Sequence, residues 1–188
     1  MGVVLSAPLI LASASPRRAE LMRLLEVEFR VLPSGADESF LRRESPEAHV
    51  RRLSGVKAEA VAAGHPECWV LGADTVVAVG REVLGKPGTP REAGRMLKKL
   101  SGREHAVYTG FTLRGIEAGI SIQEVVASKV AFRQVPDDEI AWYVNSREPY
   151  DKAGGYAVQG MAAFFIWEIQ GSYTNVMGLP LCEVLDAM

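Results

Sequence analysis

One acidic residue lies within an apolar stretch of the sequence. Burying its charge costs free energy unless the charge binds a partner. Asp74 interrupts the apolar, Val-rich run 69–79, which is typical of a buried strand. A carboxylate in such a place needs a cation, a hydrogen-bond donor or a metal ion, so Asp74 is a candidate general base or metal ligand. The alternative is an Asp that caps a bend beside Thr75. We favour the functional interpretation.

Two basic residues fall in a similarly unfavourable place. Arg17 and Arg18 are expected in the first turn of a helix, where the helix dipole is already positive. They suit an anion bound at that end of the helix, with the hydroxyl groups of Ser13 and Ser15 as further donors. A solvated helix start that happens to be basic is the alternative, and the phosphate site is the favoured interpretation.

Three lysines are candidates for the same anion. Lys57 lies four residues from both Leu53 and Val61, in the middle of an apolar helical stripe. Such a lysine either extends to solvent, which is the commoner case, or reaches a ligand. Lys86 and Lys152 stand in glycine-containing loops that permit close approach to a ligand, although each motif alone is unspecific.

Taken together, these residues suit one kind of chemistry. Scattered cations would hold a polyphosphate, while Asp74 and an acidic loop with Asp37 and Glu38 would hold a divalent ion that neutralises phosphate charge and activates water. The sequence contains neither G-x-x-x-x-G-K-[ST] nor G-x-G-x-x-G, so P-loop and Rossmann sites are not expected.

Strands and helices interleave along the chain, and several hairpins are expected. This pattern predicts a mixed α/β sheet rather than a purely parallel one. The expected strands are 9–12, 29–32, 69–79, 82–84, 107–113, a strand starting at 120, and 163–169. The expected helices are 17–25, 45–64, 89–102, 136–144 and 181–188.

The composition excludes several classes of protein. An apolar share of 48% and a charged share of 23% argue against a disordered chain. A net charge of −2 gives no overall attraction to nucleic acid or to an anionic membrane, so neither is an expected partner. No run of 18 apolar residues is present, which argues against a membrane span. The stretch 3–12 lacks the basic start of a signal peptide, so we expect a cytoplasmic protein.

The sequence does not decide the oligomeric state. The apolar residues Phe164, Phe165 and Trp167 would allow a homodimer interface, but burial in the core is the favoured interpretation.

At this point the sequence resembles the Maf nucleotide pyrophosphatases, from Leu9 to about Leu181. The resemblance rests on six motifs in this order: LASASPRR at 11–18, GADT at 72–75, GKP at 85–87, LSG at 100–102, DKAGGY at 151–156 and GLPL at 178–181. It implies a single domain over residues 1–188. It also implies a mixed, twisted α/β sheet with flanking helices and two lobes around a central cleft, similar to inosine triphosphate pyrophosphatases.

The resemblance also implies an activity and a set of residues. The implied reaction is attack of water on the α-phosphate of a nucleoside triphosphate, releasing pyrophosphate, with a divalent cation such as Mg²⁺ or Mn²⁺. The implied catalytic residues are Asp74 as proton acceptor, Glu38, Lys57 and Lys86, and the implied metal ligands are Glu38 and Asp74. The implied substrate-binding residues are Ser13, Arg17, Arg18, Thr75, Lys152 and Gln159.

Three of these positions bear on the choice of base. Arg17, Thr75 and Gln159 look like the branch that acts on dTTP and UTP, whereas the 7-methyl-GTP branch typically carries Trp, Gln and Glu there. A glutamine amide both donates and accepts hydrogen bonds, as a pyrimidine dione requires. The alternatives are that second branch, or a regulatory protein of cell division that senses nucleotides. A sensor without catalysis would not need both Asp74 and Glu38.

Overall fold

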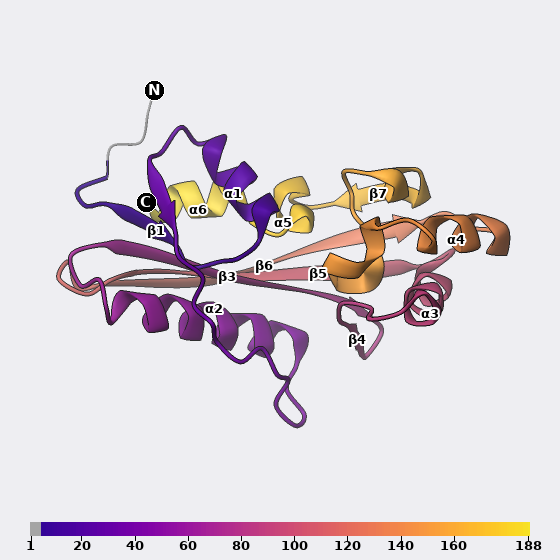
Figure 1. Cartoon of the computed structure of the whole chain (residues 1–188), viewed down its shortest axis with the longest axis horizontal. Coiled ribbons are helices and arrows are strands. Elements are labelled where there is room, and N and C mark those ends of the chain that lie inside the picture. The colour runs from indigo at the N-terminus through magenta and orange to yellow at the C-terminus, as the bar shows by residue number, and fades with distance from the viewer. Residues whose placement is uncertain (1–4) are drawn as a thin grey trace. The chain divides into compact units, whose positions relative to one another are not determined.

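The structure, a computed structural model, describes residues 5–188 (Figure 1). Residues 3 and 4 of the apolar stretch 3–12 therefore lie outside the described residues. The strands are β1 (Leu9–Leu11), β2 (Phe29–Val31), β3 (Trp69–Val79), β4 (Glu82–Leu84), β5 (Glu104–Gly115), β6 (Ile120–Phe132) and β7 (Ile166–Gln170). The α-helices are α1 (Pro16–Arg23), α2 (Pro46–Ala62), α3 (Pro90–Leu100), α4 (Asp137–Val144), α5 (Tyr173–Met177) and α6 (Leu181–Ala187).

The strands form one seven-stranded sheet of mixed direction. Its order is β2-β1-β3-β5-β6-β7, and β4 pairs with β3 beside this path. β1 runs parallel to β2 and to β3, whereas β4 and β7 run antiparallel to their partners. The prediction of a mixed α/β fold is confirmed.

The chain divides into two compact units. Unit 1 comprises Met1–Thr75, Thr109–Val126 and Gly178–Met188, and unit 2 comprises Val76–Tyr108 and Ala127–Met177. The strands β3, β5 and β6 each contribute residues to both units. The single domain over 1–188 and the central cleft stay predictions.

Within unit 1, α2 packs against the sheet at unusually short range. A Cβ on Gly72 of β3 would lie 2.4 Å from the carbonyl oxygen of Ser54 and 2.6 Å from the backbone nitrogen of Ala58. Gly110 of β5 approaches the same helix, and a Cβ on Gly110 would lie 2.3 Å from the carbonyl oxygen of Val50. Small residues in the sheet thus let the backbone of α2 come close to β3. Figure 1 shows α2 lying along the sheet.

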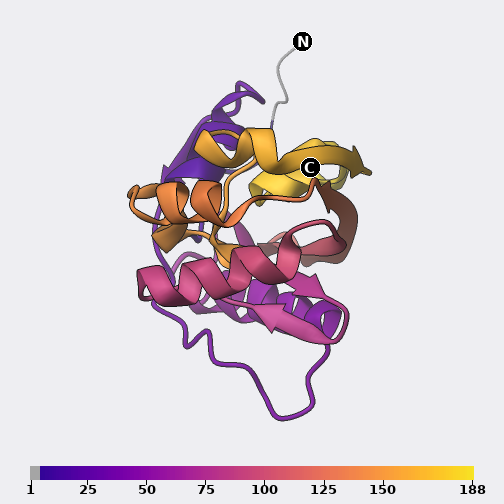
Figure 2. The same cartoon turned by 90° about the vertical axis from the view of Figure 1, so that its right-hand side faces the viewer.

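Unit 2 has its own core between α3, α4 and its part of the sheet. α3 lies beside α4 (Figure 2). The buried rings of Phe132, Tyr143, Tyr156 and Phe165 pack with edge-to-face or tilted geometry. Such ring packing adds to the stabilisation from burial alone.

The predicted strand 163–169 begins too early. Met161–Phe165 forms a 3₁₀ helix, and the strand runs over Ile166–Gln170. Glu148 stabilises the turn, since its carboxylate accepts hydrogen bonds from the backbone nitrogens of Met161 and Ala162. This contact spans more than ten residues of chain, so local pattern could not reveal it.

The preference for core burial of three aromatic residues was wrong for two of them. Phe165 is fully buried, but Phe164 is 46% exposed and Trp167 is 79% exposed. Trp167 lies at a register shift between β6 and β7, where Phe132 pairs with Ile166 and Ala131 pairs with Glu168, so Trp167 falls outside the regular pairing of the strands. Among residues 5–188, no helix is both long and apolar enough to cross a bilayer.

Candidate functional site

The predicted carboxylates meet at a buried lysine in unit 1. The Nζ of Lys57 in α2 lies 2.7 Å from Oδ1 of Asp74 in β3, and 2.6 Å from Oε1 of Glu38 in the loop before α2. The side chains of Lys57 and Asp74 are 6% and 9% exposed, while that of Glu38 is 53% exposed. Lys57 therefore neither extends freely to solvent nor simply fills the core, and the two carboxylates share one cation.

The local sequence explains this meeting. Ser45 caps α2, with Ala48 N donating to its hydroxyl oxygen at 3.2 Å, and Pro46 occupies the first turn. The helix then presents Lys57 on the face that the close approach at Gly72 brings against β3. Asp74 follows Gly72 by two residues, so it lies on the same face of the strand.

A chain of polar side chains continues from Asp74, and the sequence interpretation missed it. The Nε2 of His49 lies 3.8 Å from Oδ2 of Asp74, and its Nδ1 lies 2.9 Å from Oε2 of Glu44. Arg52 donates to both oxygens of Glu44, at 2.6 Å and 2.8 Å. The hydrogen bond from Arg52 is the main cause that lowers the pKa of Glu44 to about 2. A signal was present, since His49, Leu53 and Lys57 recur at intervals of four residues.

Arg18 forms the centre of a second network in unit 1. Its guanidinium donates to the carbonyl oxygen of Gly178 at 2.8 Å, to Ser13 Oγ at 3.1 Å and to Thr75 Oγ1 at 2.9 Å. Burial lowers the pKa of Arg18 from its ordinary value, against the attraction of the carboxylates of Asp74 and Glu38. The network joins the turn before α1, the strand β3 and the segment before α6.

This network bears on the phosphate site predicted at the start of α1. Ser15 caps the helix, and its Oγ accepts from Arg18 N at 3.5 Å. Arg18 and Ser13 are buried and bonded to one another, whereas Arg17 is half-buried. The structure therefore gives Arg18 a bonding role within the protein in addition to any role toward a ligand.

The remaining predicted residues lie in unit 2. The N–H of Gly154 donates to the carbonyl oxygen of Gly85 at 3.0 Å, which holds the loops carrying Lys86 and Lys152 together. Gly154 has a φ of +72°, and a Cβ there would lie 3.1 Å from Val77, so a glycine is required. Lys152 donates to the carbonyl oxygen of Glu148 at 2.8 Å.

Lys86 and Gln159 are both exposed. Within unit 1 the structure brings together six predicted residues in two networks, namely Glu38, Lys57 and Asp74 in one and Ser13, Arg18 and Thr75 in the other.

The donor set of the first network fits a divalent cation of the hard type. Glu38 and Asp74 both direct a carboxylate oxygen at the same cationic nitrogen, and carboxylate oxygens are the ligands that Mg²⁺ takes from proteins. Among the described residues no three His, Cys, Asp or Glu side chains form a metal-binding group. Two carboxylates completed by substrate phosphates are a usual arrangement for Mg²⁺.

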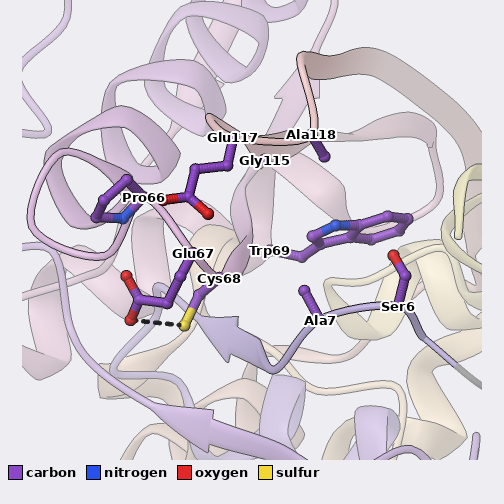
Figure 3. A pocket seen from close by; sticks show the side chains of 9 residues that line it. All are labelled: Ser6, Ala7, Pro66, Glu67, Cys68, Trp69, Gly115, Glu117 and Ala118. Carbon is purple, nitrogen blue, oxygen red and sulfur yellow. Dashed lines mark hydrogen bonds between the residues drawn. The ribbon is translucent and has the colours of Figure 1, made fainter.

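A separate pocket lies at the start of β3 (Figure 3). It has a volume of about 310 Å³, and its lining comes from residues before β1, from the start of β3 and from the β5–β6 turn. Burial raises the pKa of the Cys68 thiol there, which donates to Glu67 (Figure 3). Trp69 of this pocket precedes Asp74 by five residues of extended strand, or roughly 16 Å. None of the predicted site residues lines the pocket.

The fold and the first network define an α/β protein with a paired-carboxylate centre suited to a phosphate ligand and a divalent cation. Comparison with known families then gives the identification: the Maf-like protein family matches residues 8–188, and the chain belongs to that family.

Individual relatives agree with this result. A protein of Syntrophus aciditrophicus named dTTP/UTP pyrophosphatase is 62% identical over 98% of this chain and 90% of its own length. A protein of the same name from Geobacter sp. strain M21 is 48% identical over 97% of this chain and 95% of its own length. Another, from Myxococcus xanthus, is 49% identical over 94% of this chain and 89% of its own length.

A solved structure of a HAM1 protein from Coxiella burnetii is 17% identical, with a TM-score of 0.46, over 69% of this chain and 75% of its own.

Proposed function

We propose that this chain is a nucleoside triphosphate pyrophosphatase that converts dTTP and UTP to the monophosphate and pyrophosphate. Membership of the Maf-like family and the names of the relatives support the proposal. The observation that carries it is the buried Lys57 held between Asp74 and Glu38, because a structural protein gains little from a buried charge cluster of this kind.

In the proposed reaction, Asp74 is the general base. It takes a proton from a water molecule as the water oxygen bonds to the α-phosphorus, and the bond from that phosphorus to the bridging oxygen breaks, so that pyrophosphate leaves. Lys57 fixes Oδ1 of Asp74 and adds positive charge beside the developing negative charge. A divalent ion, when bound by Glu38 and Asp74, would neutralise phosphate charge and lower the pKa of water.

The other residues are proposed to bind the substrate. In unit 1, Arg17 and Arg18 with Ser13 and Thr75 would present positive charge and hydroxyl groups to the triphosphate. In unit 2, Lys86 and Lys152 would contact phosphate, and Gln159 would contact the base. The cytoplasmic location, a homodimer and the absence of nucleic-acid partners stay predictions.

A panel of nucleotides tests the proposal. dTTP, UTP, 7-methyl-GTP, ATP and dCTP are each incubated with the chain and either Mg²⁺ or Mn²⁺, and the products are separated by ion-exchange chromatography. The expected result is monophosphate and pyrophosphate, in equal amounts, chiefly from dTTP and UTP. Diphosphate with inorganic phosphate would contradict the proposed bond cleavage. Tight nucleotide binding without turnover would favour the regulatory alternative, and turnover chiefly of 7-methyl-GTP would favour the other branch.

A further inference from the structure

We infer that His49 is a positioning residue that holds Asp74 and the loop carrying Glu38 in their places. The inference rests on the proposed function only for its catalytic consequence, because the contacts themselves are independent of any reaction. His49 is 2% exposed and lies in α2, two turns before Lys57.

One edge of the His49 ring is fixed by a hydrogen bond. Its Nδ1 lies 2.9 Å from Oε2 of Glu44, and Glu44 is itself held by two hydrogen bonds from Arg52. Because an ionised carboxylate only accepts hydrogen bonds, the proton of this contact belongs to Nδ1. The orientation of the imidazole in its plane is thereby set.

The opposite edge of the ring faces the proposed base. The Nε2 of His49 lies 3.8 Å from Oδ2 of Asp74, which is too long for a hydrogen bond but is van der Waals contact. The other oxygen, Oδ1, binds Lys57 at 2.7 Å. The carboxylate of Asp74 is therefore confined on both of its oxygens, and an empty space at position 49 would leave one side unsupported.

The face of the ring holds the acidic loop. The ring of Phe40 stacks on that of His49 with the centroids 3.4 Å apart and the planes 3° from parallel. Glu38 precedes Phe40 by two residues, and its own side chain is half exposed. Further contacts reinforce the stack, since Arg52 donates to the carbonyl oxygen of Ser39 at 3.0 Å.

His49 thus joins three parts of unit 1: the loop with Glu38, the helix with Lys57 and the strand with Asp74. Loss of its ring would leave both carboxylates in the sequence but would loosen their spacing. Side chains that orient metal ligands without binding the metal commonly change metal affinity or activity by about 10-fold to 100-fold.

The test uses His49→Leu, which removes the ring and its three contacts with Glu44, Asp74 and Phe40. It also uses Phe40→Leu, which removes only the stacked ring on the loop. His65→Leu is the matched control, because this half-buried histidine lies beyond the end of α2. Two measurements need no nucleotide: Mn²⁺ binding, from the EPR signal of the free ion, and the rate at which trypsin cleaves the native chain after Arg42 in the loop. The steady-state kcat, the KM and the Mn²⁺ concentration that gives half-maximal activity are then measured for each variant.

Both test variants are expected to bind Mn²⁺ about 10-fold more weakly. They should also be cleaved faster after Arg42 and lose kcat with a smaller change in KM, while His65→Leu behaves as wild type. A folded His49→Leu chain with wild-type Mn²⁺ binding and wild-type cleavage overturns the inference. If His49→Leu does not fold, the same two measurements on Phe40→Leu decide the inference. Phe40→Leu should fold, because Phe40 is 45% exposed and its loss leaves the hydrogen bond from His49 to Glu44 in place.

The two proposals can fail separately. If the wild-type chain hydrolyses no nucleotide, the proposed function is wrong, but Mn²⁺ binding and tryptic cleavage still decide the role of His49. If hydrolysis occurs and these two readouts do not change in the variants, the proposed function stands and the inference about His49 does not.

Discussion

The close packing of α2 on β3 predicts that one methyl group at position 72 will disturb the site. In Gly72→Ala the new Cβ would lie 2.4 Å from the carbonyl oxygen of Ser54 and 2.6 Å from the backbone nitrogen of Ala58. Both neighbours are helix backbone, so neither can rotate away as a flexible side chain would. The helix itself must move.

The size of the effect follows from these distances. Ordinary contact begins near 3.4 Å, so α2 must retreat from β3 by about 1 Å, and overpacking of this kind costs about 1–3 kcal/mol of unfolding free energy. The same retreat stretches the 2.7 Å hydrogen bond from Lys57 to Asp74 beyond bonding distance. A misplacement of about 1 Å in a catalytic centre can lower the rate about 100-fold.

Urea denaturation and pyrophosphate release are measured together for Gly72→Ala. The control is Gly64→Ala, at the end of the same helix, where a Cβ would meet only the carbonyl oxygen of Val61 at 3.8 Å. The control should retain both stability and rate. If Gly72→Ala unfolds within about 0.5 kcal/mol of wild type and turns over normally, then close packing does not position the site.

Three further results are expected. Asp74→Asn should lower kcat about 10²–10⁴-fold while keeping the fold, and near-normal turnover would remove Asp74 from the role of base. Asp37→Asn should change kcat little, because the structure leaves Asp37 exposed with its carboxylate bonded to Ser39 of its own loop, contrary to the ion-binding role expected from the sequence. Burial lowers the pKa of His105 to about 4 from 6.5. As the pH drops from 6.5 to 4, His105 is therefore protonated in the unfolded chain before it is protonated in the folded chain, and the free energy of unfolding of the wild type should fall. Urea titrations at several pH values should show a shallower fall in His105→Phe, and equal slopes would refute the assignment. Arg17→Trp combined with Gln159→Glu should shift the substrate profile away from pyrimidines, and an unchanged profile in the nucleotide panel would place base recognition elsewhere.

Local chemistry explains why most elements were predictable. Strand β3 was expected over Trp69–Val79 and is observed there, because a long apolar run with β-branched residues has few alternatives. α1, α2 and α3 each begin after a Ser or Thr cap with a proline in the first turn, and both are local features of the sequence. At the start of α3 the backbone nitrogen of Glu92 donates to the hydroxyl of the capping Thr89, and the Glu92 carboxylate accepts from the backbone nitrogen of Gly88.

The unpredicted elements depend on distant partners. The short helix α5 contains Asn175, whose buried amide donates to Ser128 Oγ and to the carbonyl oxygen of Val107. These partners lie 47 and 68 residues away along the chain, so no local periodicity signals the helix. The 3₁₀ helix before β7 depends in the same way on Glu148.

Some residues of the candidate site were predictable from local sequence, and others depend on distant packing. Asp74 and Lys57 were identifiable because each is a charge in an apolar pattern, and such a charge must find a partner when it is buried. His49 gave only the weaker signal of its four-residue spacing with Leu53 and Lys57, and Glu44 gave none, since neither residue type is out of place at the start of a helix. Only packing reveals that His49 faces Asp74 on one side and Glu44 on the other.

The sequence by itself determined where the charges of unit 1 are costly and which elements carry them. Apolar patterning and helix capping depend on residue types that are close together in the chain. The tertiary structure alone decided which charges meet. Lys57, Asp74 and Glu38 come from a helix, a strand and a loop, and their distances depend on how closely α2 approaches the sheet. That approach depends on the volume of side chains far apart in the chain, because a glycine in the sheet admits helix backbone where any larger residue would exclude it.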